Sequence, residues 1–229
     1  MRTLATLFAL LASLALAADL PSVRSLGFAP GGRYYAFEAY GHYDGSGFPF
    51  SAYHVVDVDR NAYVARLERG GQDWAQRSLQ AVRAQTAREI APVLARYRIS
   101  GQQPGLRVYR QLPSPFADQP PGLQRVRASV RGQGLEVRLT PTSVPAAPCT
   151  FPETEMIPPG HTVRGLHLSA GGRTLQRDAQ LPRWRNCAFG YRLEEVRVYG
   201  DRVAVLLRVY LPGFEGADRL PMVVTGRWR

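Results

Sequence analysis

Lysine is absent from this sequence, and all 29 of its basic residues are arginine. Cysteine is scarce, with two residues in 229. After residue 17 no stretch is long and apolar enough to cross a bilayer, which takes roughly 20 apolar residues in a helix. The sequence therefore predicts a mature chain without a transmembrane segment.

The common catalytic and cofactor motifs are also missing. There is no P-loop, no dinucleotide fingerprint and no G-x-S-x-G nucleophile elbow. The four histidines are His42, His54, His161 and His167. They form neither H-x-H nor H-E-x-x-H, and no Cys/His pair has zinc spacing. Two of them, His54 and His167, fall in expected strands and are predicted to be hydrogen-bonded structural residues. The sequence thus indicates no catalytic residue, no cofactor and no metal site.

The first 17 residues have the order of a cleavable secretory signal peptide. Arg2 supplies a positive end, residues 4–16 are almost wholly apolar, and Ala15-Leu16-Ala17 offers the small residues that a signal peptidase reads. A membrane anchor is the alternative, but the apolar run is too short for it. We expect residues 18–229 to be a soluble secreted domain, periplasmic or extracellular.

The two cysteines, Cys149 and Cys187, are expected to form a disulfide because the chain is exported to an oxidising compartment. Their separation lacks the C-x-x-C spacing of a redox pair, and a zinc site would need two further ligands.

The formal net charge of +11 suggests an anionic partner, but charge alone supports only non-specific attraction. Arg125, Arg127 and Arg131 alternate with apolar residues, as solvated outward positions of half-buried strands do. No run of five or six like charges occurs. The pattern favours a scattered basic surface without a specific nucleic-acid site, and leaves non-specific polyanion binding as an alternative function.

The hydrophobic pattern predicts a mainly β (α+β) fold in one domain. Short strands divided by glycine turns indicate a β meander over residues 18–70. Apolar residues at spacings of three and four predict a helix within 72–100, begun by an Asp73–Gln76 capping box. Pro92 predicts a kink there, or two helices that meet at Ala91. Residues 102–123 are expected to be an extended connection. A second β region, 124–229, contains hairpins, and the apolar run 203–207 predicts a central strand buried on both faces.

These antiparallel hairpins should form a sandwich or a partial propeller-like sheet with one kinked surface helix. The propeller alternative depends on residues 28–35, which resemble the hairpin of a TolB-like propeller blade. Too few strands are predicted for a complete propeller.

Two loops have the composition of binding loops. The first, 43–50, places aromatic residues beside a carboxylate and flexible glycines, and could stack on a sugar or peptide; the second, 213–219, could present two carboxylates and an arginine. The candidate binding residues are Tyr43, Asp44, Ser46, Phe48, Glu215, Asp218 and Arg219. Both loops could equally be structural, with Phe48 and Phe50 in the core and an Asp218–Arg219 contact closing a turn.

The residues of these loops also carry a family resemblance. The run 27–41 followed by Asp44-Gly45-Ser46-Gly47-Phe48-Pro49, and the later runs 187–192 and 213–219, resemble the opening and closing segments of a bacterial family known only as predicted secreted proteins of unknown function. The resemblance implies export and a single domain, and it implies no activity.

We therefore expect an exported, non-enzymatic protein that binds another protein or a glycan of the cell envelope or exterior. The enzymatic alternative is a hydrolase with a carboxylate pair. That alternative needs two carboxylates close together in a cleft, chosen from Glu38, Asp44, Glu215 and Asp218.

Overall fold

The computed structural model describes residues 18–112, 119–145, 149, 157, 160–213 and 216–229. They form three antiparallel sheets of four strands each, with one α-helix. The elements are β1 (Ser22–Phe28), β2 (Tyr34–His42), β3 (Pro49–Asp57), β4 (Ala62–Gly70), α1 (Leu79–Arg96), β5 (Leu106–Arg110), β6 (Gln124–Val130), β7 (Gln133–Ser143), β8 (Arg164–Ala170), β9 (Arg173–Arg177), β10 (Gly190–Tyr199), β11 (Arg202–Pro212) and β12 (Ala217–Arg227). The mainly β prediction is confirmed.

The first sheet is the predicted meander, in the order β1-β2-β3-β4. Its hairpins follow from alternating apolar residues that end at turn residues. Between β1 and β2, Gly31 and Gly32 adopt φ of 80° and 77°, a left-handed conformation that glycine adopts without steric cost.

The central sheet has the order β12-β11-β10-β5, and β11 is buried on both faces as the sequence predicts. Its side chains alternate between two cores. Val203, Val205 and Leu207 face the third sheet, whereas Ala204 and Leu206 pack against the first sheet. A strand covered on both sides needs no polar alternation, which explains its continuous apolar sequence.

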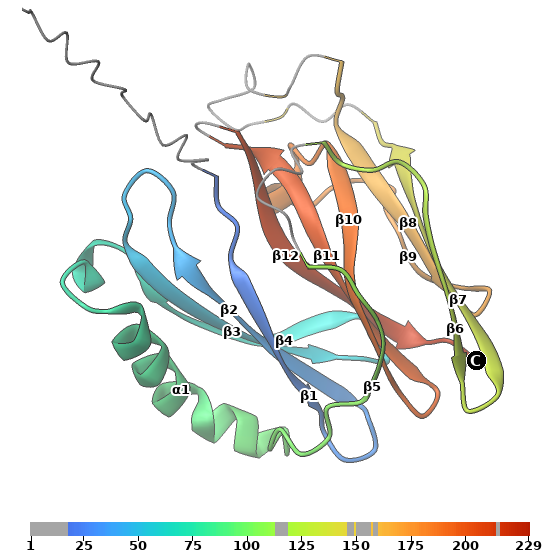
Figure 1. Ribbon diagram of the computed structural model, residues 1–229, viewed down its shortest axis with the longest axis horizontal. Coiled ribbons are helices and arrows are strands. Elements are labelled where there is room, and N and C mark those ends of the chain that lie inside the picture. The colour runs from blue at the N-terminus through green and yellow to red at the C-terminus, as the bar shows by residue number, and fades with distance from the viewer. Residues whose placement is uncertain (1–17, 113–118, 146–148, 150–156, 158–159, 214–215) are drawn as a thin grey trace, which may run out of the picture.

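The third sheet has the order β6-β7-β8-β9 and covers the other face of the central sheet. The molecule is therefore a stack of α1, first sheet, central sheet and third sheet (Figure 1). A sandwich and a partial propeller-like sheet were the two predicted arrangements. The described residues form the sandwich, since their sheets are stacked, and they form no closed barrel.

The helix covers the outer face of the first sheet but begins later than predicted. Residues 72–74 form a 3-10 turn, and α1 starts at Leu79 after Ser78, whose side chain accepts a hydrogen bond from the Ala81 N–H. The predicted Asp73–Gln76 capping box is therefore wrong, because Ser78 caps the helix. The helix continues through Pro92 as one element and ends at Arg96 rather than near residue 100.

The predicted connection 102–123 contains a strand that the sequence analysis did not identify. In this stretch β5 pairs with the edge of the central sheet through β10. Its five residues alternate only weakly in burial, and Leu106 is half-exposed, as is common on an edge strand.

The predicted disulfide joins Cys149 to Cys187, with 5.0 Å between their Cα atoms. Cys187 is fully buried beside the start of β10. The bridge ties the long connection between β7 and β8 to the segment that enters the central sheet.

Candidate functional site

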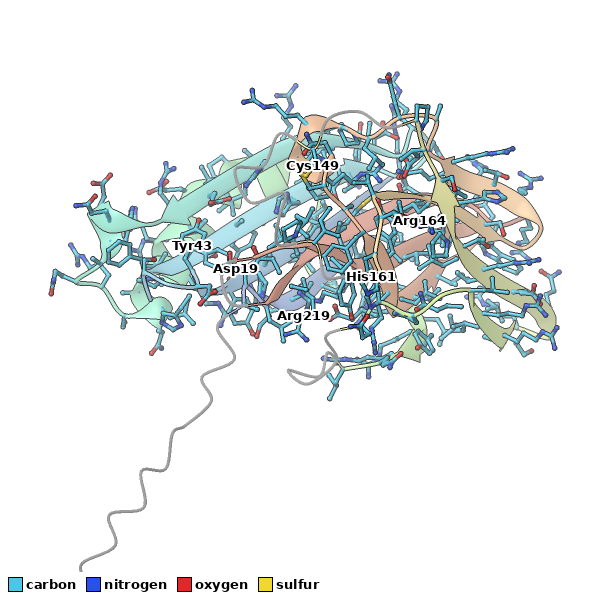
Figure 2. The ribbon with its side chains drawn as sticks, turned by 90° about the horizontal axis from the view of Figure 1, so that it is seen from above. Asp19, Tyr43, Cys149, His161, Arg164 and Arg219 are labelled. Carbon is cyan, nitrogen blue, oxygen red and sulfur yellow. A yellow bond between two sulfur atoms is a disulfide. The ribbon has the colours of Figure 1, made fainter. Side chains whose placement is uncertain are left out.

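Asp19 joins the two loops that the sequence singles out. Its carboxylate Oδ1 accepts a hydrogen bond from the backbone N–H of Asp44 at 2.6 Å, and its own N–H donates to Asp218 Oδ1 at 2.8 Å. The Asp19 carbonyl accepts the Arg219 N–H at 2.8 Å. Figure 2 shows Asp19 between Tyr43 and Arg219. The two loops, whose Asp44 and Asp218 are 174 positions apart in the chain, thus meet on one short N-terminal segment.

The loop between β2 and β3 is held by its own backbone. The Tyr43 N–H donates to the Phe48 carbonyl and the Gly47 N–H to the Tyr43 carbonyl, both at 2.9 Å. Ser46 is exposed, and its hydroxyl accepts the Phe48 N–H at 3.3 Å. Phe50 is buried and Phe48 half-buried, so the structural alternative holds for Phe50. In this loop Ser46 shapes the turn, and Tyr43 carries the aromatic surface.

The N-terminal segment is anchored to the central sheet by a buried arginine. Arg208 on β11 is 1 % exposed, donates to the Pro21 carbonyl at 2.7 Å, and forms a buried ion pair with Glu194. A buried charge is tolerated only when it is paired and hydrogen-bonded. The interface of the first and central sheets therefore changes from apolar at Leu206 to polar at Arg208.

A cleft of about 170 Å³ lies beside this polar region, between the first and central sheets. Small side chains of the first sheet make room for it, and Pro221 from β12 closes the opposite side. Its lining residues are Asp19, Pro21, Ala39, Tyr43, Phe50, Ala52, His54, Arg66, Glu68, Leu220 and Pro221.

One wall of the cleft is aromatic and its rim is charged. The rings of Tyr43 and Phe50 stack with centroids 4.4 Å apart and planes at 20°. The Tyr43 hydroxyl donates to Glu68 at 2.5 Å, and Glu68 also pairs with Arg66. These contacts fix the Tyr43 ring. The cleft therefore has a preorganised aromatic wall, with hydrogen-bonding groups beside it at the rim.

His54, on β3, is the least satisfied polar side chain of the cleft. Its ring stacks on Phe37 at 4.7 Å and meets the Tyr63 ring edge-on at 5.7 Å. Desolvation by burial, helped by the charge of Arg66, lowers the pKa of His54 to about 4. The buried Nδ1 has no hydrogen-bond partner among the described residues. The prediction of a fully hydrogen-bonded histidine is therefore wrong here, because apolar and aromatic neighbours surround the ring.

The carboxylates considered for acid/base chemistry have different environments. Asp44 and Asp218 are brought together through Asp19, whose pKa is raised by desolvation. Glu215 lies outside the described residues. Glu38 is fully buried elsewhere, between the first sheet and α1.

Glu38 serves to attach the helix. It accepts hydrogen bonds from Arg83 on α1 at 2.8 and 2.9 Å, from Arg24 at 2.9 Å and from Ser51 at 3.1 Å. Burial raises its pKa, but the two arginines outweigh burial and leave the pKa of Glu38 below its ordinary value. All of its contacts are structural, so Glu38 is not available to form a pair in the cleft.

Two of the other histidines, His161 and His167, do not line the cleft. The His167 Nε2 is 3.1 Å from the Thr174 hydroxyl on the third sheet, and His161 packs on Phe189 with centroids 5.4 Å apart. Within the part of the chain that the structure describes, no three metal-ligating side chains cluster.

A larger cavity, of about 560 Å³, opens at the other end of the strands, near the β10–β11 turn. It is lined mainly by turn and connection residues, among them Gly105, Arg131 and Gly200. The smaller cleft contains His54 and Asp19, whose pKa values are shifted by burial. Perturbed groups in a cleft indicate function better than volume alone, so we take the smaller cleft as the candidate site.

Of the residues that line the cleft, the sequence singled out Tyr43 as a binding candidate. Tyr43, Asp44, Asp218 and Arg219 converge as candidate residues, and Ser46 and Phe48 support the loop. Asp19, His54 and Glu68 were missed, although the alternation of β3 and β4 places His54 and Glu68 on the same face as Ala52.

A family model described as "Predicted secreted protein", domain of unknown function 2259, matches residues 36–227. The match confirms the resemblance noted in the sequence and describes a secreted protein. No curated protein and no solved structure matches the chain. Among the described residues, no helix is long and apolar enough to cross a membrane.

Proposed function

The chain belongs to this family of secreted proteins of unknown function, and from that premise we propose that it is a non-enzymatic binding protein of the periplasm or cell exterior. Its ligand is one saccharide ring of an envelope or extracellular glycan, held in the cleft between the first and central sheets.

The unpartnered Nδ1 of His54 in a preformed cleft is the observation that carries this proposal. A buried polar atom without a partner costs about 1–3 kcal/mol of stability. Such atoms are rare in native proteins, and here the residue that carries one, His54, lines the cleft. Rotation of the imidazole about its Cβ–Cγ bond would turn this nitrogen toward a ligand hydroxyl, and a hydroxyl suits either form of the nitrogen because it both donates and accepts.

The size of the cleft limits the ligand. A volume of 170 Å³ equals that of about six water molecules, at about 30 Å³ each. Sites for drug-sized molecules have about 300–1,000 Å³. The cleft therefore accepts one ring or one side chain, with the rest of the molecule outside.

The distribution of polar groups favours a sugar ring over an apolar side chain of a partner protein. The apolar walls, formed by Ala39 and Ala52 on one side and Pro221 on the other, match the C–H face of a saccharide. Arg66, Glu68 and other charged groups at the rim can bond its hydroxyls. An apolar side chain would leave these groups desolvated without new partners, which costs binding free energy.

The test is binding of glycan fragments to the purified mature protein, first on a glycan array and then by calorimetry. Ala52→Leu places a large side chain in the cleft and should abolish binding. His54→Phe keeps the ring contacts but loses Nδ1, and should weaken binding about fivefold to tenfold, because a hydrogen bond contributes about 1–1.5 kcal/mol. His42→Phe is the matched control on an exposed residue of the same sheet and should bind like the wild type.

Each outcome is decisive when thermal unfolding shows that the variants are folded. Undiminished binding by Ala52→Leu would place the ligand elsewhere and overturn the proposal. Failure of every glycan, together with saturable binding of a peptide that Ala52→Leu abolishes, would replace the saccharide by a protein side chain.

A further inference from the structure

The outer face of the third sheet gathers arginines that are dispersed in the sequence. Alternation along β6 and β7 directs Val126, Val137 and Leu139 to the core and leaves the residues between them outside. The pairing of β7 with β8 and of β8 with β9 extends this outer face over all four strands. Its outward positions are Arg125, Arg127, Ser129, Glu136, Arg138, Thr140, Thr142, His167, Ser169, Thr174 and Arg177.

Register places the four arginines along one line. Arg125 on β6 is directly opposite Arg138 on β7, and Arg127 lies one outward position farther along β6. Arg177 lies on β9, two strands beyond β7, where it pairs with His167 on β8. With strands about 4.8 Å apart and about 6.8 Å between outward neighbours, Arg127 and Arg177 are separated by roughly 20 Å. Arg127, Arg125, Arg138 and Arg177 thus form a diagonal across the sheet, which we call the arginine diagonal.

Little negative charge balances this line. Glu136 is the one carboxylate among the outward positions named above, and it pairs with Arg127 at 2.9 Å and Arg125 at 3.4 Å. Arg138 and Arg177 are exposed and form no ion pair with a described residue. The remaining outward positions carry mainly hydroxyl groups, which can donate hydrogen bonds to oxyanions. The face therefore presents excess positive charge and hydrogen-bond donors.

We propose that the arginine diagonal is a binding track for a linear anionic polysaccharide, one that carries carboxylate or sulfate groups along its chain. A guanidinium binds such oxyanions with two parallel hydrogen bonds. This second surface is independent of the cleft, which lies between the first and central sheets on the far side of the central sheet.

The shape of the track favours a polysaccharide over other anionic partners. A bilayer offers charge over an area, and the third sheet presents its arginines in a line without an outward aromatic or large aliphatic residue to enter the interface. Single-stranded nucleic acids are held by aromatic stacking in addition to charge, and these outward positions contain no phenylalanine, tyrosine or tryptophan. A flexible linear polyanion needs only the line of guanidinium and hydroxyl groups.

The experiment compares two triple variants that lose the same charge. R125Q/R138Q/R177Q removes three members of the diagonal and keeps Arg127, so that Glu136 retains an ion-pair partner. R77Q/R88Q/R96Q removes three exposed arginines around α1, at the opposite end of the stack (Figure 1). Binding to alginate, dextran sulfate and neutral dextran is measured by interferometry at about 50 and 300 mM salt, which differ in charge screening.

We expect saturable binding of alginate or dextran sulfate by the wild type and none of neutral dextran. The diagonal variant should lose about tenfold or more in affinity. The α1 variant should stay within about twofold, because salt screens charges that lie farther from the bound polysaccharide than the Debye length of about 10 Å. An equal loss in both variants would reduce the binding to bulk charge and overturn the proposal. Stronger binding to phosphatidylglycerol vesicles or to single-stranded DNA, lost in the diagonal variant, would also overturn it.

Discussion

Replacing His54 by phenylalanine should remove a specific part of the pH dependence of folding. The imidazole is packed between the rings of Phe37 and Tyr63, and burial lowers its pKa from 6.5 to about 4. Between these two pH values the unfolded chain binds a proton that the folded protein does not. The free energy of unfolding therefore has its full contribution from His54 above pH 6.5 and loses it as the pH falls toward 4.

The size of this effect follows from the shift. A pKa that falls from 6.5 to about 4, at 1.36 kcal/mol per pH unit, corresponds to a loss of about 3 kcal/mol on acidification. Phenylalanine fills a similar volume, keeps the aromatic contacts and cannot be protonated. At pH 4 the His54→Phe variant should therefore gain about 3 kcal/mol relative to the wild type, compared with their difference at pH 7.

The measurement is urea unfolding of the wild type and His54→Phe at pH 7, 6, 5 and 4. Other titrating groups are common to both proteins, so they cancel in the difference between the two free energies. His42→Phe, at an exposed position, serves as control for the substitution itself. If the difference between the wild type and His54→Phe stays constant over this range, the imidazole is solvated and the argument for a desolvated cleft fails.

Three further predictions concern the contacts that hold the fold and the site. Replacing Cys149 and Cys187 by alanine should lower the free energy of unfolding by about 4 kcal/mol, because the bridge closes a loop with a sequence separation of 38; urea unfolding measures it. Glu38→Gln should cost about 2 kcal/mol in thermal unfolding, since it leaves Arg83 without its carboxylate while the guanidinium still reaches water. Asp19→Ala removes the acceptor of the Asp44 N–H and should cost about 1 kcal/mol, seen as faster hydrogen exchange of that amide.

The strands were predictable because their information is local. Period-two alternation and glycine turns mark the hairpins of the first and third sheets, and the uninterrupted apolar run of β11 indicates burial on both faces. The helix start was misjudged for an equally local reason. Asp73 and Gln76 have the spacing of a capping box, but Asp73 lies inside a 3-10 turn. The side chain that caps α1 is that of Ser78, which accepts the Ala81 N–H.

The strand β5 was missed because its partner is distant in the sequence. It lies among proline, glutamine and glycine residues, and only pairing with β10 makes it a strand. Edge strands gain hydrogen bonds on one side alone and need little apolar sequence. Its short alternation around Val108 was the available signal, but the composition of the surrounding stretch outweighed it.

Little of the cleft was predictable, for a related reason. Loop composition pointed to Tyr43 and Asp218, but nothing in either loop predicts that they meet. Their meeting depends on Asp19, which follows the predicted signal-peptide cleavage point. Nothing in the sequence pattern around Asp19 distinguishes it from an ordinary residue at the start of a domain. The stacking of two sheets creates the cleft, and no single segment of the sequence predicts which sheets pack together.

One residue nevertheless contained a usable signal. Arg208 interrupts the apolar run of β11, a strand whose burial on both faces leaves no outward position for a charge. A charge in such a strand must be paired inside the protein, and the two consecutive glutamates of β10, Glu194 and Glu195, are the acidic residues nearest to it across the hairpin. Its remaining donors then need acceptors at the same interface, which the Pro21 and Arg219 carbonyls provide. An arginine within an otherwise apolar central strand therefore marks the place where two sheets stop packing through apolar contacts, and here that place adjoins the cleft.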